Sequence, residues 1–258
     1  MFLRDTGGDG PVVLLLHGWL VSADLNWCGS YDALATAGYR VLAPDHRGHG
    51  RGIRTFERFT LADCAADAAS LLSELNCGPA IVVGYSMGGA IAQLMAREHP
   101  DTVAALVLSA TCQHFQDDQT RRAWKWMWLL GLLLRAAPRR TYASGFRRLR
   151  IATDEHGAWW LSEMLRSDPR AMADAGRELG RFDSRPWLSP VTLPAAVVVT
   201  SRDRSVSPSK QRELAYALGA SVMEAAIDHL EPTDRADLYN PALLDALSAV
   251  AQRAVPAP

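Results

Sequence analysis

Short runs of consecutive apolar residues recur along the chain, separated by segments whose apolar positions follow a helical spacing. The five residues from Val12 to Leu16 are all aliphatic and follow a Gly-Pro turn signal. A continuous apolar run of this length is typical of a strand buried on both faces of a parallel sheet. Similar runs predict strands at residues 40–43, 80–83, 105–108 and 195–199, with a weaker one at 221–225.

Amphipathic segments lie between these predicted strands. In residues 63–75, the apolar side chains recur so that they fall on one face of a helix. The same spacing predicts helices at residues 90–98, 210–218 and 241–253. Because strands alternate with helices, we predict an α/β fold with a mostly parallel, twisted sheet flanked by helices. Ligands of such sheets bind at the carboxyl ends of the strands.

The alternation stops between Cys112 and Trp187, where no strand pattern occurs. Six of the eight tryptophans lie in this part of the chain, and residues 121–150 hold nine basic residues and no acidic one. We interpret residues 112–187 as a mostly helical cap over the carboxyl edge of the sheet. This cap divides the α/β core into residues 1–111 and 188–258.

Composition and charge exclude several classes of protein. The chain is 48% hydrophobic and 21% charged, which is typical of a globular protein rather than a disordered one. Its net charge of −1, from 27 basic and 28 acidic residues, gives no overall field that would attract nucleic acid. We interpret the basic stretch in the cap as a solvated face, with an anionic substrate or an acidic membrane surface as the alternatives.

Cysteine usage and the longest apolar segment bear on localisation. The four cysteines have neither zinc-ligand nor redox spacing, which favours a reducing compartment. The apolar segment 126–134 is too short to span a bilayer, and the N-terminus has no apolar core of a signal peptide. We therefore expect a cytoplasmic protein without a transmembrane segment. The sequence does not predict its oligomeric state.

The strongest chemical signal is the motif Gly84-Tyr85-Ser86-Met87-Gly88, which follows one predicted strand and opens the next helix. This strand–turn–helix context is that of a nucleophile elbow, in which a sharp turn exposes a serine hydroxyl. Bulky side chains two residues before or after the serine would clash, so glycine is needed at both positions. We therefore predict that Ser86 is a catalytic nucleophile.

A serine hydroxyl needs an adjacent base, most often a histidine that a carboxylate orients. In this type of fold the chain order is serine, acid, histidine. Asp203 and His229 follow two later predicted strands, so both lie at the edge where Ser86 lies. Asp228 is the rival acid, but neighbouring residues of an extended segment point to opposite faces, which favours Asp203.

Acyl transfer also needs two hydrogen-bond donors for the negatively charged oxygen of its intermediate. We predict the backbone N–H groups of Met87, directly after the nucleophile, and of Trp19, in the loop after the first predicted strand. His17, in the same loop, is interpreted as a structural residue that braces the loop by hydrogen bonds. His46 and His49 lie near Asp45, but the neighbouring glycines indicate a turn, so we expect neither a metal site nor a cofactor.

Together these residues resemble the α/β-hydrolase fold family, in particular its branch of bacterial serine esterases and cofactor-free haloperoxidases. The motifs that carry the resemblance are His17-Gly18-Trp19, Ser22-Ala23-Asp24, Trp27, Asp45-His46-Arg47-Gly48-His49-Gly50 and Tyr85-Ser86-Met87-Gly88-Gly89. The resemblance implies a triad of Ser86, Asp203 and His229, an oxyanion hole at Trp19 and Met87, and esterase activity, sometimes with perhydrolysis by peroxide. Leu20 stands where that branch usually has proline, which weakens the perhydrolase reading.

The expected substrate is a small acyl compound, in the first place a carboxylic ester with an apolar or aromatic group. We expect Trp124, Trp128, Trp159 and Leu230 to line its pocket, because the tryptophans of the cap would surround an apolar group. Three alternatives stay open: a perhydrolase or haloperoxidase, a carbon–carbon bond hydrolase, and a ligand receptor that keeps the fold. The carbon–carbon bond hydrolases of this fold have extra glycines after the His-Gly pair, which this chain lacks.

Overall fold

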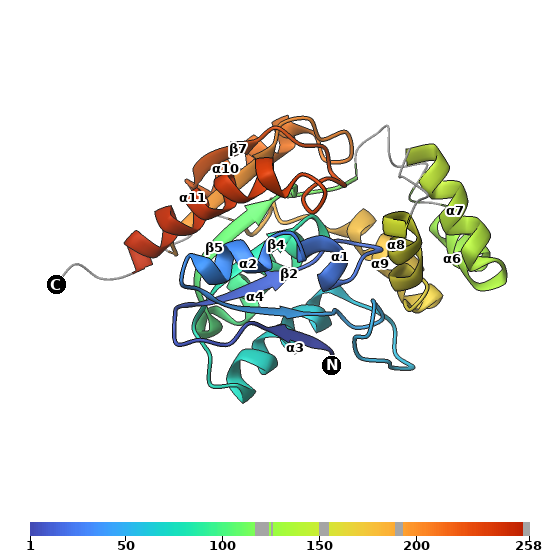
Figure 1. Ribbon diagram of the computed structural model, residues 1–258, viewed down its shortest axis with the longest axis horizontal. Coiled ribbons are helices and arrows are strands. Elements are labelled where there is room, and N and C mark those ends of the chain that lie inside the picture. Colours follow the sequence, from blue (N-terminus) through green and yellow to red (C-terminus); the bar gives the residue numbers. More distant parts are fainter. Residues whose placement is uncertain (117–123, 125, 150–154, 189–192, 255–258) are drawn as a thin grey trace.

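The computed structural model describes residues 1–116, 124, 126–149, 155–188 and 193–254. A twisted seven-stranded sheet lies at its centre (Figure 1). The strands are β1 (Leu3–Asp5), β2 (Val12–Leu16), β3 (Arg40–Pro44), β4 (Ala80–Tyr85), β5 (Val103–Ser109), β6 (Ala195–Thr200) and β7 (Ser221–Ala225). Their order is β1-β3-β2-β4-β5-β6-β7, and all neighbours are parallel except β1 and β3. The prediction of a mostly parallel sheet with flanking helices is confirmed.

All six predicted strands are present, and β1 is the strand that the sequence analysis missed. It has three residues, of which two are charged, and lies at the edge of the sheet. So short and polar a segment carries neither an apolar run nor a clear alternation. Its pairing with β3 brings Arg4 beside Ala43, next to the loop that follows β3.

Helices cover both faces of the sheet, which explains why its strands are apolar without interruption. On one face, Leu14, Val82 and Leu106 pack against α3 (Leu61–Glu74), α4 (Met87–Glu98) and α10 (Pro208–Leu218). On the other face, Val13, Val83 and Val107 pack against α1 (Ala23–Trp27), α2 (Tyr31–Thr36) and α11 (Ala236–Ala254). Successive strand residues point to opposite faces, so two hydrophobic layers need apolar residues at every position.

The four predicted helices are confirmed, and each of them begins earlier than the apolar spacing indicated. Helix α3 begins at Leu61 because the Thr60 hydroxyl accepts a hydrogen bond from the Asp63 amide at 3.0 Å. Helix α11 begins at Ala236, so Pro241 lies inside it rather than at its first turn. A proline has no backbone N–H to donate to the carbonyl four residues earlier, so the helix lacks one hydrogen bond at this point. Helices α1 and α2 were missed because each has at most six residues.

Among the described residues, four further helices lie between β5 and β6, in the segment that we predicted to be the cap. They are α6 (Met127–Ala136), α7 (Pro138–Leu149), α8 (Glu155–Met164) and α9 (Pro169–Arg181). Helix α6 packs on α7 and α9, and α7 on α8. Buried side chains from all four helices, among them Leu134, Phe146, Trp160 and Met172, form a cluster of their own with Leu25 of the core. The boundaries at residues 111/112 and 187/188 stay a prediction.

Candidate active site

Ser86 lies in the turn that joins β4 to α4, in a strained backbone conformation with φ 54° and ψ −113°. Its N–H donates to the Ser109 carbonyl at 2.9 Å, and its own carbonyl accepts from the Thr111 hydroxyl at 2.8 Å. A Cβ at Gly84 would meet the Gly88 backbone, and one at Gly88 would meet the Leu16 carbonyl. The glycines therefore have the steric reason that the motif predicts, and the turn points the Ser86 hydroxyl away from the sheet.

His229 comes from the loop after β7 and reaches this hydroxyl. Its Nε2 lies 3.0 Å from Ser86 Oγ, within hydrogen-bonding distance. The last residue of β4 fixes this loop, because the Tyr85 hydroxyl donates to the His229 carbonyl at 2.8 Å. Burial raises the pKa of Tyr85 well above its ordinary value, so this phenol keeps the proton that it donates.

Asp203, in the loop after β6, holds the other nitrogen of the ring. Its Oδ2 lies 2.7 Å from His229 Nδ1 and also accepts from the Thr200 hydroxyl at 2.8 Å. Its Oδ1 accepts from the backbone N–H groups of Ser205 and Val206, both at 2.8 Å. Because the side chain is fully buried and both of its oxygens have hydrogen-bond partners, the carboxylate is held in one orientation.

Asp228, the rival acid, points away from the imidazole ring. Its carboxylate forms an ion pair with Arg204, with Nε to Oδ2 at 2.6 Å, and accepts the backbone N–H of His229 at 2.7 Å. Burial alone would raise the pKa of Asp228, but these hydrogen bonds outweigh it and the pKa is lowered. The structure thus brings Asp203, and not Asp228, to the His229 ring.

The two predicted oxyanion donors lie beside the serine. Gly18 packs against Ser86, since a Cβ at Gly18 would lie 3.5 Å from that of Ser86. Trp19 follows in the same loop, and Met87 is the first residue of α4. Within the described part of the chain, neither the Trp19 nor the Met87 backbone N–H donates a hydrogen bond to another protein group. A ligand oxygen that reached these two N–H groups would therefore displace no protein partner.

Hydrogen bonds from several elements fix this loop. The Gly18 N–H donates to the Asn26 side-chain oxygen of α1 at 2.8 Å. The His17 ring lies 2.8 Å from the Gly18 carbonyl through Nδ1 and accepts the His46 N–H at 2.9 Å through Nε2. These partners require a neutral ring with its proton on Nδ1. His17 braces the loop, as its sequence position predicts.

A cavity of about 370 Å³ opens in front of Ser86 and His229. Of the four residues expected to line it, Trp124 and Leu230 do so. Its other apolar lining comes from the core and the cap: Trp19, Leu20, Val21, Leu25, Phe115, Trp160, Leu179, Val206 and Pro232. An apolar group therefore fits this cavity, beside Ser86 and His229.

The expectations for Trp128 and Trp159 need correction. Trp128 lies on the outer side of α6, 58% exposed, and lines a different groove. Trp159 packs on the cluster inside the cap, whereas its neighbour Trp160 lines the cavity. Adjacent residues of a helix point about 100° apart, so only one of the two tryptophans can face the cavity. The sequence gives no signal for which one does.

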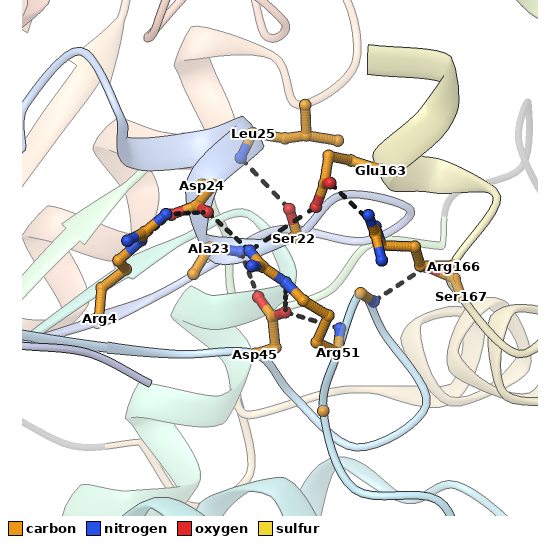
Figure 2. A network of polar contacts seen from close by, with 12 residues as sticks. Arg4, Ser22, Ala23, Asp24, Leu25, Asp45, Arg51, Glu163, Arg166 and Ser167 are labelled. Carbon is orange, nitrogen blue, oxygen red and sulfur yellow. Dashed lines mark hydrogen bonds and ion pairs between the residues drawn. The ribbon is translucent and has the colours of Figure 1, made fainter. Parts of the chain in front are cut away.

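A network of arginines and buried carboxylates joins the segment predicted as the cap to the core beside this site (Figure 2). Arg51, in the loop after β3, donates to Asp24 of α1 at 2.6 Å and lies 3.7 Å from Glu163 of α8. Arg166 donates to the other oxygen of Glu163 at 2.9 Å. Burial would raise the pKa of Asp24, but hydrogen bonds from Arg4 and Arg51 outweigh it and lower the pKa. The network connects the cap to α1, whose Asn26 holds the oxyanion loop.

Three histidine rings, those of His17, His46 and His49, lie close to one another at the loop that holds Trp19. The His17 ring centre lies 4.2 Å from that of His46 and 5.3 Å from that of His49. Burial lowers the pKa of all three, and for His46 and His49 the lowering is large. Across the described residues, no group of three histidine, cysteine or acidic side chains is arranged to hold a metal ion.

These neutral histidines make the fold sensitive to mild acid. Their folded-state pKa values lie below the ordinary value of 6.5, so the unfolded chain takes up protons first as the pH falls. The contribution of these histidines to the free energy of unfolding is therefore fully present above pH ~6.5 and decreases as the pH falls below that value. Between pH 7.5 and 5.5 we expect the free energy of unfolding, measured with urea, to fall by about 1 kcal/mol per histidine.

The variant H49F tests this assignment, because it removes one of these buried titrating groups. We expect it to reduce the pH-dependent loss by about 1 kcal/mol. The control is F59L, since the Phe59 ring packs on His49 and does not titrate. F59L should lower stability equally at both pH values. An unchanged pH dependence in H49F would contradict the assignment.

Comparisons with known proteins identify the family to which this fold belongs. A sequence model described as the alpha/beta hydrolase fold matches residues 11–215. A non-heme chloroperoxidase from Streptomyces lividans is 39% identical over 110 residues, which are 42% of this chain and 40% of that protein. A bifunctional esterase/perhydrolase from Acinetobacter calcoaceticus is 36% identical over 110 residues, again 42% and 40%. The matched part thus spans less than half of the length of these relatives.

A solved structure extends the likeness to nearly the whole chain. The crystal structure of a hydrolase from Pseudomonas aeruginosa PA01 superposes with a TM-score of 0.83. It covers 96% of this chain and 94% of that protein, at 23% identity. At this identity the likeness shows the fold alone. Because the family model covers most of the chain, the chain belongs to the α/β-hydrolase fold family.

Proposed function

We propose that this protein is a cofactor-free serine hydrolase that acts on carboxylic esters with an apolar acyl or aromatic group. The observation that carries the proposal is the chain of hydrogen bonds from Asp203 through His229 to Ser86 at the wall of an apolar cavity. A serine, an imidazole and a buried carboxylate in this order activate the hydroxyl for attack on a carbonyl. The family membership and the esterase activity named for one relative support the same class of reaction.

The proposed reaction has two halves. His229 Nε2 takes the proton of Ser86 as Oγ attacks the ester carbonyl, and Asp203 stabilises the resulting imidazolium. The free N–H groups of Trp19 and Met87 bind the oxyanion, and the alcohol leaves with the proton from His229. Water then attacks the acyl-enzyme, with His229 again as the base, and releases the acid.

A perhydrolase activity is the second candidate. It is favoured by the names of the two relatives, a chloroperoxidase and an esterase/perhydrolase. In that case hydrogen peroxide replaces water in the second half-reaction, and the same three residues act. Leu20 is the feature of this chain that argues against it. In the loop that carries the predicted oxyanion donor, Leu20 has a left-handed backbone with φ 67°, which the proline usual in that branch cannot adopt.

A panel of p-nitrophenyl esters from acetate to dodecanoate, assayed with and without peroxide and bromide, tests both candidates. We expect ester turnover without peroxide, with a maximum at a medium chain length because the cavity holds about 370 Å³. Faster peroxide-dependent bromination would favour the perhydrolase instead. A fluorophosphonate probe that labels Ser86 in a protein without turnover on any ester would indicate a ligand receptor and contradict the proposal.

The variant W160A tests whether the cavity binds the acyl chain. We expect kcat/KM for the preferred ester to fall about tenfold to a hundredfold, mainly through KM, because one apolar wall is lost. The matched control is W159A, whose side chain lies in the same helix but outside the cavity. Equal losses in both variants would indicate a general effect on the cap.

A further inference from the structure

Helix α6 presents an apolar face to solvent. Its inner side packs into the cap through Gly131 and Leu134, which are buried. Its outer side and the residue before it carry large apolar side chains with about half of their surface exposed: Trp126 58%, Trp128 58%, Leu132 54% and Leu133 45%. The two tryptophan rings lie 6.2 Å apart. Exposed apolar side chains gathered in this way mark an interaction surface.

A loop of the core extends the same surface. Phe56, in the loop between β3 and α3, is entirely exposed. Phe56 lines a groove of about 650 Å³ together with Trp128 and Leu132. The groove does not include Ser86 or His229, so it is separate from the proposed catalytic cavity.

Helix α6, which carries this face, and helix α7, which packs on it, have only positive charges among their described side chains. Arg135 of α6 and Arg139, Arg140 and Arg147 of α7 are exposed, and residues 126–147 contain no acidic side chain. Three acids line the groove, namely Glu57, Asp168 and Asp174, against six arginines, and Asp174 pairs with Arg177. Figure 1 shows α6 and α7 at one end of the molecule, away from α10 and α11. We call Phe56, Trp126, Trp128, Leu132, Leu133, Arg135, Arg139, Arg140 and Arg147 the α6 patch.

We propose that the α6 patch binds the surface of an anionic lipid bilayer. Tryptophan and leucine beside a set of arginines is the composition of helices that lie in the membrane interface. None of the described helices is long and apolar enough to cross a bilayer, and α6 has 10 residues, so the helix lies on the membrane. A second copy of this chain fits less well, because a two-fold contact would bring two sets of arginines of like charge into one interface.

The position of the patch suggests why a hydrolase would bind there. Trp124, which lines the proposed catalytic cavity, precedes the patch residue Trp126 by two positions. A protein bound through α6 would thus hold the cap at the membrane surface, where apolar esters partition. Binding itself does not depend on the proposed catalysis, so the two are tested separately.

Flotation of the full chain with vesicles tests the proposal. We expect binding to vesicles of 70% phosphatidylcholine and 30% phosphatidylglycerol at 50 mM salt, and little binding to pure phosphatidylcholine. The double variant R139Q/R140Q should lower the partition coefficient about thirtyfold, since each arginine contributes about fivefold. The double variant W128A/L132A should lower it at least about tenfold, because the apolar contact is lost.

Two matched controls separate the patch from general effects. R212Q/R253Q removes the same charge from exposed positions on α10 and α11, and Y216A removes an aromatic ring that is 90% exposed. Both should bind like the wild type. The proposal is overturned by a lack of flotation with anionic vesicles, by equal binding to neutral ones, or by patch variants that bind normally. A dimer that W128A/L132A dissociates, without vesicle binding, would assign the patch to a second copy.

Discussion

Replacing Ser86 with alanine should lower kcat/KM for the preferred p-nitrophenyl ester by about 10⁵-fold, with the fold retained. The hydroxyl that His229 contacts at 3.0 Å would be absent, so no acyl-enzyme could form. Ser86 is nearly buried and its side chain makes no other hydrogen bond in the described part of the chain. Its loss should therefore change the urea midpoint little, and fluorophosphonate labelling should disappear together with turnover.

Ser205 provides the matched control, because this serine lines the same cavity. It supports Asp203 through its backbone N–H, which an alanine keeps. The S205A variant should therefore retain turnover within about fivefold of the wild type. If S86A kept its activity while S205A lost it, the nucleophile would have to be sought elsewhere in the cavity.

The local part of this site could be predicted from the sequence because its constraints are local. The turn at Ser86 needs glycines at fixed positions, a strand before it and a helix after it, and all three are visible in one stretch of the chain. Asp203 could be predicted because it follows a strand and precedes the histidine in chain order. The alternation of side chains also separated it correctly from Asp228 as the partner of the His229 ring.

The cap resisted prediction because its arrangement depends on distant contacts. Which of Trp159 and Trp160 faces the cavity is decided by the rotation of α8 on the core. Contacts such as that of Glu163 with Arg51, 112 residues earlier, help to set this rotation. Similarly, Trp128 is a large aromatic residue of the kind that lines pockets, yet its position on α6 leaves its side chain exposed to solvent. Apolar spacing reports that a helix has a buried face, but it does not report what the face packs against.

The same reasoning explains why the polar network of Figure 2 was missed. Its members, Arg4, Asp24, Arg51 and Glu163, come from β1, α1, a loop and the cap. Taken singly in the sequence, each has the pattern of a solvated surface residue. Burial of Asp24 and Glu163 becomes evident only when the loop after β3 and the cap are brought together.

Asp203→Asn should lower kcat by about 10³–10⁴-fold while leaving KM nearly unchanged. The buried carboxylate accepts the proton on Nδ1 of His229. An asparagine that turns its amide nitrogen toward the ring donates to Nδ1 instead, which moves the ring proton to Nε2. That nitrogen could then no longer accept the proton of Ser86. The substrate cavity stays intact, so ground-state binding is expected to persist.

Asp228→Asn is the control, since Asp228 lies next to His229 in the sequence but pairs with Arg204. Its ion pair is largely exposed on the arginine side, so we expect a change in kcat of less than about fivefold. The contrast between the two variants distinguishes the roles of the two acids. If both lowered kcat equally, the charge near the loop, rather than the orientation of the imidazole by Asp203, would govern the reaction.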